Sequence, residues 1–410
     1  SEVLYIKNLP SNNKKSLTVI VYDKKYKDNL ISLGSLVSFK LENCNWNLNS
    51  NFSRLQELNF ALGWGLNQYK FNSFKVLNYL NITKKNNIKE LVTFLSSIFY
   101  GKELINIPSS DMGPDSLEKT FINFAEFYSL DSKIYKGDII QKDFPLIYAV
   151  GKASLQAPRL LEMNLNQNTT YPLITLIGKG VCFDTGGLNI KPSQFMRNMK
   201  KDMGGAASIL SLANIIIRNK LKVNLKVLIP TVDNDIGSGS MRPGDVYNSK
   251  AGLKVEIGNT DAEGRLILAD TLAYADSFKP NLIIDFATLT GAARVALGPD
   301  LPVYFTHSNE IASLIDELSF TEEDPLWRLP LWEKYNSWLK SDVADTNNIS
   351  KGSFAGSITA ALFLNKFVKT KNWIHIDTYA WSDNHYPGHS VGGDILGVRS
   401  VYKFIKKFIS

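Results

Sequence analysis

From about residue 88 onward, short apolar runs of strand length alternate with longer segments whose apolar residues recur at helical spacing. This alternation favours a mostly parallel sheet covered by helices on both faces. We expect strands at Leu146–Val150, Thr175–Phe183, Val223–Thr231, Leu282–Thr288 and Trp373–Thr378. We expect helices at Ile88–Leu104, Leu117–Tyr128, Gly204–Asn219, Arg265–Ser277, Glu310–Leu318, Pro330–Lys340 and Phe354–Phe367. The sequence therefore predicts an α/β fold with a mostly parallel central sheet flanked by helices.

The first 85 residues have a different pattern, with asparagine and lysine clustered between short elements. Strands are expected at Leu17–Tyr22, Leu36–Leu41 and Val76–Ile82, and a helix near Leu55–Tyr69. This composition predicts a smaller N-terminal α/β domain over residues 1–85 and a larger domain over residues 86–410.

Composition excludes several classes of protein. The two cysteines give neither a disulfide framework nor a C-x-x-C site and indicate a reducing compartment. No basic-then-apolar leader opens the chain and no apolar run approaches the length of a membrane span, so we expect a cytoplasmic protein without membrane contact. The net charge of +7 comes from scattered lysines without a nucleic-acid-reading motif, so we expect no nucleic-acid partner.

The segment 259–265, Asn-Thr-Asp-Ala-Glu-Gly-Arg, places Asp261 and Glu263 two positions apart, just before a helical pattern. In an extended backbone, residues i and i+2 point to the same side, so both carboxylates could hold one cation. The alternative is that these acids lie in the first turn of the following helix, where its dipole favours negative charge. This segment alone leaves both interpretations open.

A second cluster follows the predicted strand Thr175–Phe183. Lys179 lies where the apolar strand would bury it, and Asp184 lies where the strand gives way to a Gly-Gly turn. Because these two positions differ by an odd number, both reach one site only if the chain bends or bulges between them. Asp202 precedes a helical pattern and alone would be interpreted as an N-cap. Taken with Asp261 and Glu263, the set favours a shared site at the carboxyl ends of the strands.

The cluster offers carboxylate oxygens and a lysine amine but no zinc-binding histidine motif, although the chain has four histidines. Three aspartates and a glutamate are more than one divalent ion needs, so two ions that share bridging carboxylates fit better. Other kinds of site find little support. No phosphate-binding loop surrounds Lys179, Ser154 lacks an evident histidine partner, and Cys182 is interpreted as a small buried apolar residue.

With these residues in place, the chain resembles the leucyl aminopeptidases of the M17 metallopeptidase family, as a bacterial-type member with a short N-terminal domain. The resemblance covers roughly residues 86–410 and rests on many motifs in the family's order. They are Gly178–Gly180 with Phe183–Gly187, Lys191-Pro192, Asp202–Ala207, Arg242–Val246, Asn259–Asp270, Ala287–Ala292, Trp327–Leu331, Ala344–Asn348 and Ile358–Ala361.

The resemblance implies a dimetal centre in which Asp184 and Glu263 bridge the two ions. Lys179 and Asp202 would complete one ion's ligands and Asp261 the other's. The cofactors implied are two divalent ions, Zn²⁺, Mn²⁺ or Mg²⁺, together with bicarbonate. The substrate-binding positions are Met199, Thr288, Leu289 and Gly291, although core filling is the alternative for Met199.

The activity implied is exopeptidase hydrolysis of N-terminal residues, preferably apolar and leucine-like, from peptides through a water that bridges the metals. Lys191 would stabilise the oxyanion, and Arg265 would hold bicarbonate as the general base. The family likeness also implies a homohexamer. Two other functions remain open: a nucleic-acid-binding regulator that keeps the peptidase fold, and a structural assembly protein.

The chain departs from the family pattern at two places. The loop Asn106–Asp111 lacks the second asparagine of an Asn-x-Pro-x-Asn motif, and Asp377–Trp381 reads Asp-Thr-Tyr-Ala-Trp in place of Asp-x-Ala-Gly. These departures affect the expected substrate preference and leave every predicted metal and catalytic position intact.

Overall fold

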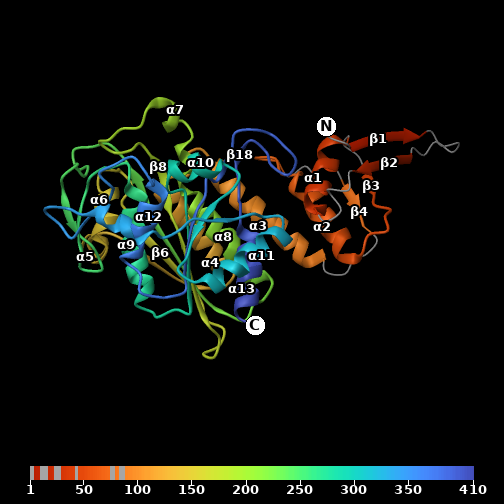
Figure 1. Cartoon of the computed structure of the whole chain (residues 1–410). Coiled ribbons are helices and arrows are strands. Elements are labelled where there is room, and N and C mark those ends of the chain that lie inside the picture. Colours follow the sequence, from red (N-terminus) through yellow and green to blue (C-terminus); the bar gives the residue numbers. More distant parts are fainter. Residues whose placement is uncertain (1–3, 10–16, 23–28, 42–44, 74–78, 83–87) are drawn as a thin grey trace. The chain divides into compact units, whose positions relative to one another are not determined.

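The computed structural model describes residues 4–9, 17–22, 29–41, 45–73, 79–82 and 88–410 (Figure 1). The chain forms two compact units, residues 1–95 with 384–390 and residues 96–383 with 391–410. The units divide within a helix that follows residue 87, whereas the predicted domain boundary lies between residues 85 and 86 and stays a prediction.

The larger unit is built on a nine-stranded sheet within the described residues. Five neighbouring strands run parallel, in the order β16-β12-β7-β9, with β8 also paired to β9. Antiparallel pairing extends both edges. On one side β13 runs antiparallel to β16, with β14 parallel to β13, and on the other β6 runs antiparallel to β9, with β5 antiparallel to β6. The strands are β5 Asp131–Tyr135, β6 Arg159–Leu165, β7 Leu173–Gly178, β8 Gly180–Asp184, β9 Asn224–Asn234, β12 Leu282–Ala287, β13 Val303–Phe305, β14 Trp327–Arg328 and β16 Trp373–Asp377.

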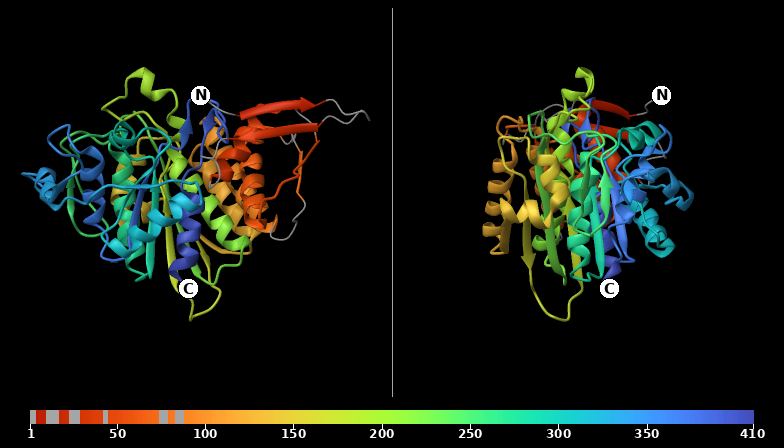
Figure 2. Two further views of the ribbon diagram at one scale, coloured as in Figure 1. Left: turned by 45° about the vertical axis from the view of Figure 1, so that its right-hand side comes forward. Right: turned by 90° about the vertical axis from the view of Figure 1, so that its left-hand side faces the viewer.

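Helices cover both faces of this sheet (Figures 1 and 2). One layer contains α4, α8, α11 and α13, and the other contains α6, α9 and α12. The bounds of these helices are α4 Pro114–Phe127, α6 Pro145–Gly151, α8 Gly204–Arg218, α9 Glu263–Asp276, α11 Asn309–Thr321, α12 Gly356–Asn365 and α13 Val398–Phe408. Two further helices are α3 Ile88–Asn106 and α5 Asp138–Asp143. The predicted fold class, a mostly parallel sheet flanked by helices, is confirmed.

Short elements lie in the connections. They are the helices α7 Ser193–Met196, η2 Met199–Met203, α10 Gly291–Leu297 and η3 Glu333–Leu339, and the strands β10 Val246–Asn248, β11 Lys254–Glu256, β15 Thr346–Asn347, β17 Trp381–Ser382 and β18 Gly392–Gly393. The predicted helix Pro330–Lys340 is therefore a 3₁₀ helix over Glu333–Leu339.

The sequence analysis was wrong about Leu146–Val150, which is not a strand but part of helix α6. This helix begins with Pro145 at a first-turn position, where its missing N–H costs nothing. Leu146, Ile147, Ala149 and Val150 are all buried, and a short apolar run buried nearly all round has no periodicity that separates helix from strand. Strands β5 and β6 were not predicted.

Among its described residues, the smaller unit contains two packed helices, α1 Leu30–Lys40 and α2 Arg54–Leu66, together with the first part of α3 and two strand pairs. The antiparallel pair is β1 Leu4–Leu9 with β2 Leu17–Tyr22, and the parallel pair is β3 Asn45–Asn47 with β4 Tyr79–Asn81. The predicted strand Leu36–Leu41 is wrong, because it is the last part of α1. Of the predicted strand Val76–Ile82, residues 76–78 lie outside the described residues, and the remainder contains β4.

Glycines bring α1 and α2 close together. A Cβ on Gly34 would lie 2.0 Å from the carbonyl oxygen of Phe60, and one on Gly63 would lie 1.8 Å from that of Ile31. Any larger residue would force the helices apart.

None of the helices in the described residues combines the length and the apolar character of a membrane span.

Candidate functional site

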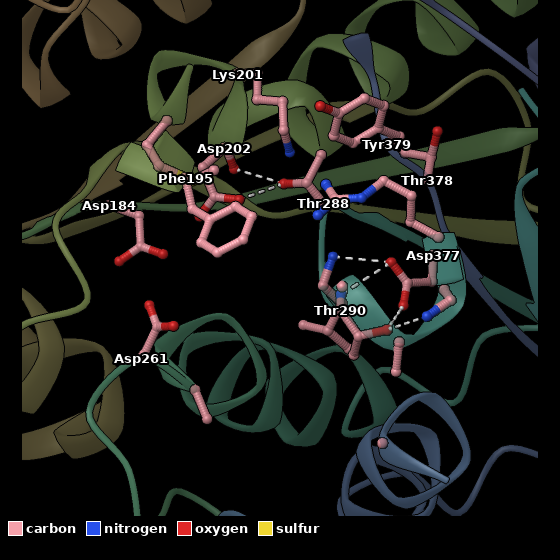
Figure 3. A pocket seen from close by; sticks show the side chains of 18 of the residues that line it. Asp184, Phe195, Lys201, Asp202, Asp261, Thr288, Thr290, Asp377, Thr378 and Tyr379 are labelled. Atoms are coloured by element: carbon pink, nitrogen blue, oxygen red, sulfur yellow. Dashed lines mark hydrogen bonds between the residues drawn. The ribbon is translucent and has the colours of Figure 1, made fainter. Parts of the chain in front are cut away.

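The carboxyl ends of the parallel strands open into a cavity of about 540 Å³. Strand β8 ends at Asp184, β12 leads into Thr288, and β16 ends at Asp377, as open α/β sheets place their sites. The cavity is lined by every site residue that the sequence predicted: Lys179, Asp184, Lys191, Met199, Asp202, Asp261, Glu263, Arg265, Thr288, Leu289 and Gly291. Figure 3 shows part of this lining.

Lys179 lies in the gap between β7 and β8, where the predicted single strand is interrupted. The bend inferred from the odd spacing of Lys179 and Asp184 is therefore present, with a further register shift along β8. The buried amine lies 2.8 Å from Asp202 Oδ2 and 2.9 Å from Glu263 Oε1, and it donates to the Thr288 carbonyl at 2.9 Å. Residues from four segments of the chain thus meet at one nitrogen.

Glycines make room for this lysine. A Cβ on Gly264 would lie 2.6 Å from Lys179 Nζ, and one on Gly205 would lie 2.9 Å from the Lys179 backbone nitrogen. A Cβ on Gly178 would lie 2.6 Å from Cα of Ala206, in the first turn of α8. Close packing of helix, strand and lysine therefore requires glycine at these positions.

Lys191 links a second pair of carboxylates. Its amine lies 2.7 Å from Asp184 Oδ2 and also contacts Asp261 Oδ1. The other oxygen of Asp184 accepts from the Asn234 side chain at 2.8 Å and from the Gly186 backbone at 2.9 Å. The carboxylates of Asp184 and Asp261 face each other across the cavity (Figure 3).

Asp261 lies in a turn and Glu263 is the first residue of α9, so of the two interpretations left open for this segment the extended backbone is wrong. Glu263 does lie in the first turn of a helix, as the alternative held, yet both side chains still line the cavity. The turn is fixed by Asn259, whose side chain accepts from the Asp261 N–H at 2.7 Å. The N-cap alternative for Asp202 is also wrong, because the N-cap of α8 is Met203 and has no side-chain hydrogen bond.

Negative charge exceeds positive charge where these groups converge. Ligand atoms of Asp184, Asp202 and Glu263 lie within 4.8 Å of one another, and Asp261 adds a fourth carboxylate against the two lysines. Burial and the neighbouring Asp184 raise the pKa of Glu263 to about 8, and the same two causes raise that of Asp261 to about 6. Burial opposes the charge on Lys179, but the surrounding carboxylates outweigh it and raise the lysine's pKa.

The donor set fits divalent cations. Asp202 Oδ2 and Glu263 Oε1 are buried and accept no hydrogen bond within the described part of the chain, although each lies beside the Lys179 ammonium. Buried carboxylate oxygens of this kind normally have hydrogen-bond donors or a metal ion. Oxygen-rich sites with one amine and no thiolate suit Mg²⁺, Mn²⁺ or Zn²⁺.

Arg265 lies at the edge of this cluster and is 8 % exposed. One terminal nitrogen donates to the Asn348 carbonyl at 2.6 Å, whereas the buried Nε has no hydrogen-bond partner among the described residues. Burial lowers the pKa of Arg265 to about 10, which leaves the guanidinium charged at neutral pH. A buried, partly unsatisfied guanidinium in a cavity is suited to a planar oxyanion.

The sequence analysis did not assign a site role to Asp377, Lys201, Arg294 or Tyr379, which also line the cavity. Asp377 holds the loop after β12, since it accepts from the N–H groups of Leu289 and Thr290 at 2.9 and 3.2 Å. The available signal for Asp377 was its place at the end of a predicted parallel strand. The signal for Tyr379 was the departure of Asp377–Trp381 from the family pattern, whereas Lys201 and Arg294 gave no comparable signal because they come from two separate elements, η2 and α10.

The fold and the cavity define an α/β protein with a carboxylate-rich candidate metal site at the strand ends. A family model described as "Cytosol aminopeptidase family, catalytic domain" matches residues 99–402. The chain belongs to this family.

Relatives and solved structures agree with that assignment. The chain is 41% identical over 329 residues to a probable cytosol aminopeptidase of Chlamydia abortus and 39% identical to one of Chlamydia trachomatis, each alignment covering 78% of this chain. It spans 65% of the length of each of these two relatives.

Among solved structures, the cytosol aminopeptidase of Coxiella burnetii superposes with a TM-score of 0.92 at 39% identity, over 99% of this chain and 90% of that one. The bottromycin maturation enzyme BotP in complex with Mn superposes with a TM-score of 0.91 at 26% identity, over 99% of this chain and 94% of that one.

Proposed function

We propose that this protein is a metal-dependent aminopeptidase that removes the N-terminal residue from peptides. The observation that carries the proposal is the convergence of four carboxylates on two lysines at the strand ends, with oxygens of Asp202 and Glu263 that accept no hydrogen bond. Membership of the cytosol aminopeptidase family and the Mn complex of the structurally similar BotP support a metal-dependent activity.

In this proposal, Asp184, Glu263, Lys179, Asp202 and Asp261 would together hold two divalent ions. The bound ions would be Zn²⁺, Mn²⁺ or Mg²⁺, and they would supply Lewis acidity and a water of lowered pKa as nucleophile. Lys179 would bind as the neutral amine. The ions favour this form because their positive charge would replace that of the bound protons in balancing the carboxylates.

Lys191 remains charged and stabilises negative charge on the carbonyl oxygen during attack. Burial opposes its charge, but Asp184, Glu263 and Asp261 together raise its pKa above the usual value, which supports a charged ammonium at neutral pH. It therefore acts as a fixed positive charge beside the reacting carbonyl.

Arg265 is proposed to hold bicarbonate, which would take a proton from the attacking water. Support comes from its buried Nε, free of hydrogen bonds among the described residues, at the edge of the carboxylate cluster. Met199, Thr288, Leu289 and Gly291 would bind the substrate's first residue, and the apolar side chains of Met199 and Leu289 favour a leucine-like group there.

The test is the turnover of aminoacyl amides after chelation and again after adding Zn²⁺, Mn²⁺ or Mg²⁺. We expect loss of activity on chelation and recovery with at least one ion. Activity that is indifferent to chelators would contradict the proposal. A cytoplasmic location and a homohexamer stay predictions, and the nucleic-acid-binding alternative is not carried forward because the relatives compared are aminopeptidases.

A further inference from the structure

The cavity has a second charged wall that the proposed catalytic residues do not use. Lys201 lies on η2, Arg294 lies on α10, and Tyr379 follows β16. All three line the same cavity as the carboxylate cluster. Figure 3 shows Lys201 directed inward between Asp202 and Tyr379.

The two cations flank one aromatic ring. Lys201 Nζ lies 4.7 Å from the centre of the Tyr379 ring, and the guanidinium carbon of Arg294 lies 4.6 Å from it. Lys201 is only 5 % exposed, and Arg294 is partly buried. Cations over an aromatic face gain some stabilisation, but the ring carries no net charge to neutralise them.

Neither cation forms an ion pair with a carboxylate in the described part of the chain. Asp202 is adjacent to Lys201 in sequence, but its Oδ2 lies beside Lys179 and its Oδ1 accepts from the Thr288 hydroxyl at 2.7 Å. A buried ammonium that no carboxylate contacts directly is costly, so such a group in a cavity favours a binding partner that brings negative charge.

The proposed reaction leaves these cations unexplained. The metal ligands already contact Lys179 and Lys191, and the proposed oxyanion lies at Lys191. Lys201 and Arg294 instead line the cavity together with Thr288 and Gly291, where the substrate's first residue would lie.

Building on the proposed aminopeptidase function, we propose that Lys201 and Arg294 form a carboxylate-binding subsite that selects peptides carrying an acidic group close to the scissile bond. Two groups of a peptide have this chemistry: an acidic first side chain, and the terminal carboxylate of a dipeptide. Either would pair with the two cations and would extend substrate choice beyond the apolar group expected from Met199 and Leu289.

Two pairs of compounds that differ only in charge test the proposal. Aminocoumarin amides of glutamic acid (through the α-carboxyl) and glutamine compare the first side chain, and leucylglycine and leucylglycinamide compare the terminal carboxylate. We expect kcat/KM to favour the charged member of at least one pair by about tenfold, which corresponds to about 1.4 kcal/mol. The pair that shows the preference identifies the source of the carboxylate.

Two substitutions test whether the named cations cause this preference. In Lys201→Gln and in Arg294→Gln, the ratio of kcat/KM between charged and neutral members should fall by about tenfold. The ratio is taken within each variant, so an altered metal content affects both members of a pair equally and cancels from the ratio. Arg294 is partly exposed and its variant keeps the test valid if Lys201→Gln does not fold. The exposed Lys222, which also loses one positive charge in Lys222→Gln, is the matched control and should keep the wild-type ratio.

Turnover of a leucyl aminocoumarin amide separates this inference from the proposed function. If that amide is not hydrolysed, the aminopeptidase assignment fails, and the four test compounds are then used as ligands in calorimetry, where the same preference is expected in Kd. The inference is overturned if neither charged compound is preferred more than twofold. It is also overturned if the preference survives in both the Lys201 and Arg294 variants.

Discussion

Two buried glutamates of the larger unit each face a lysine, and they differ in how completely they are neutralised. Glu162 on β6 lies 2.5 Å from Lys226 on β9, and its oxygens also accept from the Asn164, Tyr135 and Tyr274 side chains. Glu263 lies beside Lys179, but its Oε1 accepts no hydrogen bond and three further carboxylates lie nearby.

The two environments shift the glutamate pKa values in opposite directions. Burial opposes the charge of Glu162, but hydrogen bonds from Lys226, Tyr274 and Asn164 outweigh it and lower the pKa. Burial and Asp184 raise the pKa of Glu263 to about 8. A balanced, fully bonded pair therefore stabilises the fold, whereas surplus carboxylate charge with unsatisfied oxygens indicates a site for cations.

The largest effect is expected from the lysine that the reaction requires. Lys191→Ala should lower kcat by about 10²–10³-fold or more, as loss of an oxyanion donor does. Metal content, measured on the purified protein, should stay near normal, because removing a cation leaves the carboxylates of Asp184 and Asp261 more available. Equal loss of metal and of turnover would instead mean that Lys191 is structural, and Lys222→Ala is the control.

A substitution in the balanced pair of Glu162 and Lys226 should change the stability of the protein and leave its activity unchanged. Lys226→Met removes the charged partner of buried Glu162 and should reduce the free energy of unfolding by about 3 kcal/mol. The kcat of the folded fraction should stay at the wild-type value, because Lys226 is not among the residues that line the cavity. Denaturant unfolding and turnover, measured on the same preparation, check both expectations. A large fall in kcat without a change in stability would remove the distinction between the two pairs.

A smaller effect is expected in the pH dependence of stability without metal ions. The folded protein holds a proton on Glu263 up to a pH of about 8, whereas the unfolded chain releases it above about 4.5. The contribution of Glu263 to stability therefore falls as pH rises between these values, and Glu263→Gln should flatten that fall.

The contribution of Glu162 to stability changes with pH in the opposite direction. Its lowered pKa gives a stabilisation that is present above a pH of about 4.5 and is lost as pH falls through the folded-state value. Glu162→Gln should therefore lower the melting temperature of chelated protein at pH 7 by roughly a few degrees, with a smaller difference in acid. Parallel pH profiles for the Glu162 and Glu263 variants would contradict the comparison.

The sequence predicted which residues meet at the strand ends better than it predicted the bounds of the elements around them. The alternation of elements placed Asp184 at the end of a parallel strand, and the odd spacing from Lys179 predicted the bend that the structure contains. Lysine as a metal ligand and the roles of Lys191 and Arg265 came from the family resemblance alone. Spacing would have assigned Lys179 only as a charge partner.

The failures share a physical cause, which is that tertiary packing outweighs local pattern. The run Leu146–Val150 is apolar on every side because α6 is buried nearly all round, so it resembled a buried strand. Strand β5 gave no apolar signal because three of its five residues are exposed. Lys201 and Arg294 become neighbours only when η2 and α10 meet at Tyr379, and no local spacing reports such a contact.

The number of divalent ions bound per chain tests the central claim most directly. Metal analysis of protein equilibrated with Mn²⁺ or Zn²⁺ and then desalted should find two ions in the wild type and in Glu162→Gln, and at most one in Asp261→Asn. Wild-type protein that binds no ion, or an equal loss in the Glu162 and Asp261 variants, would contradict the account.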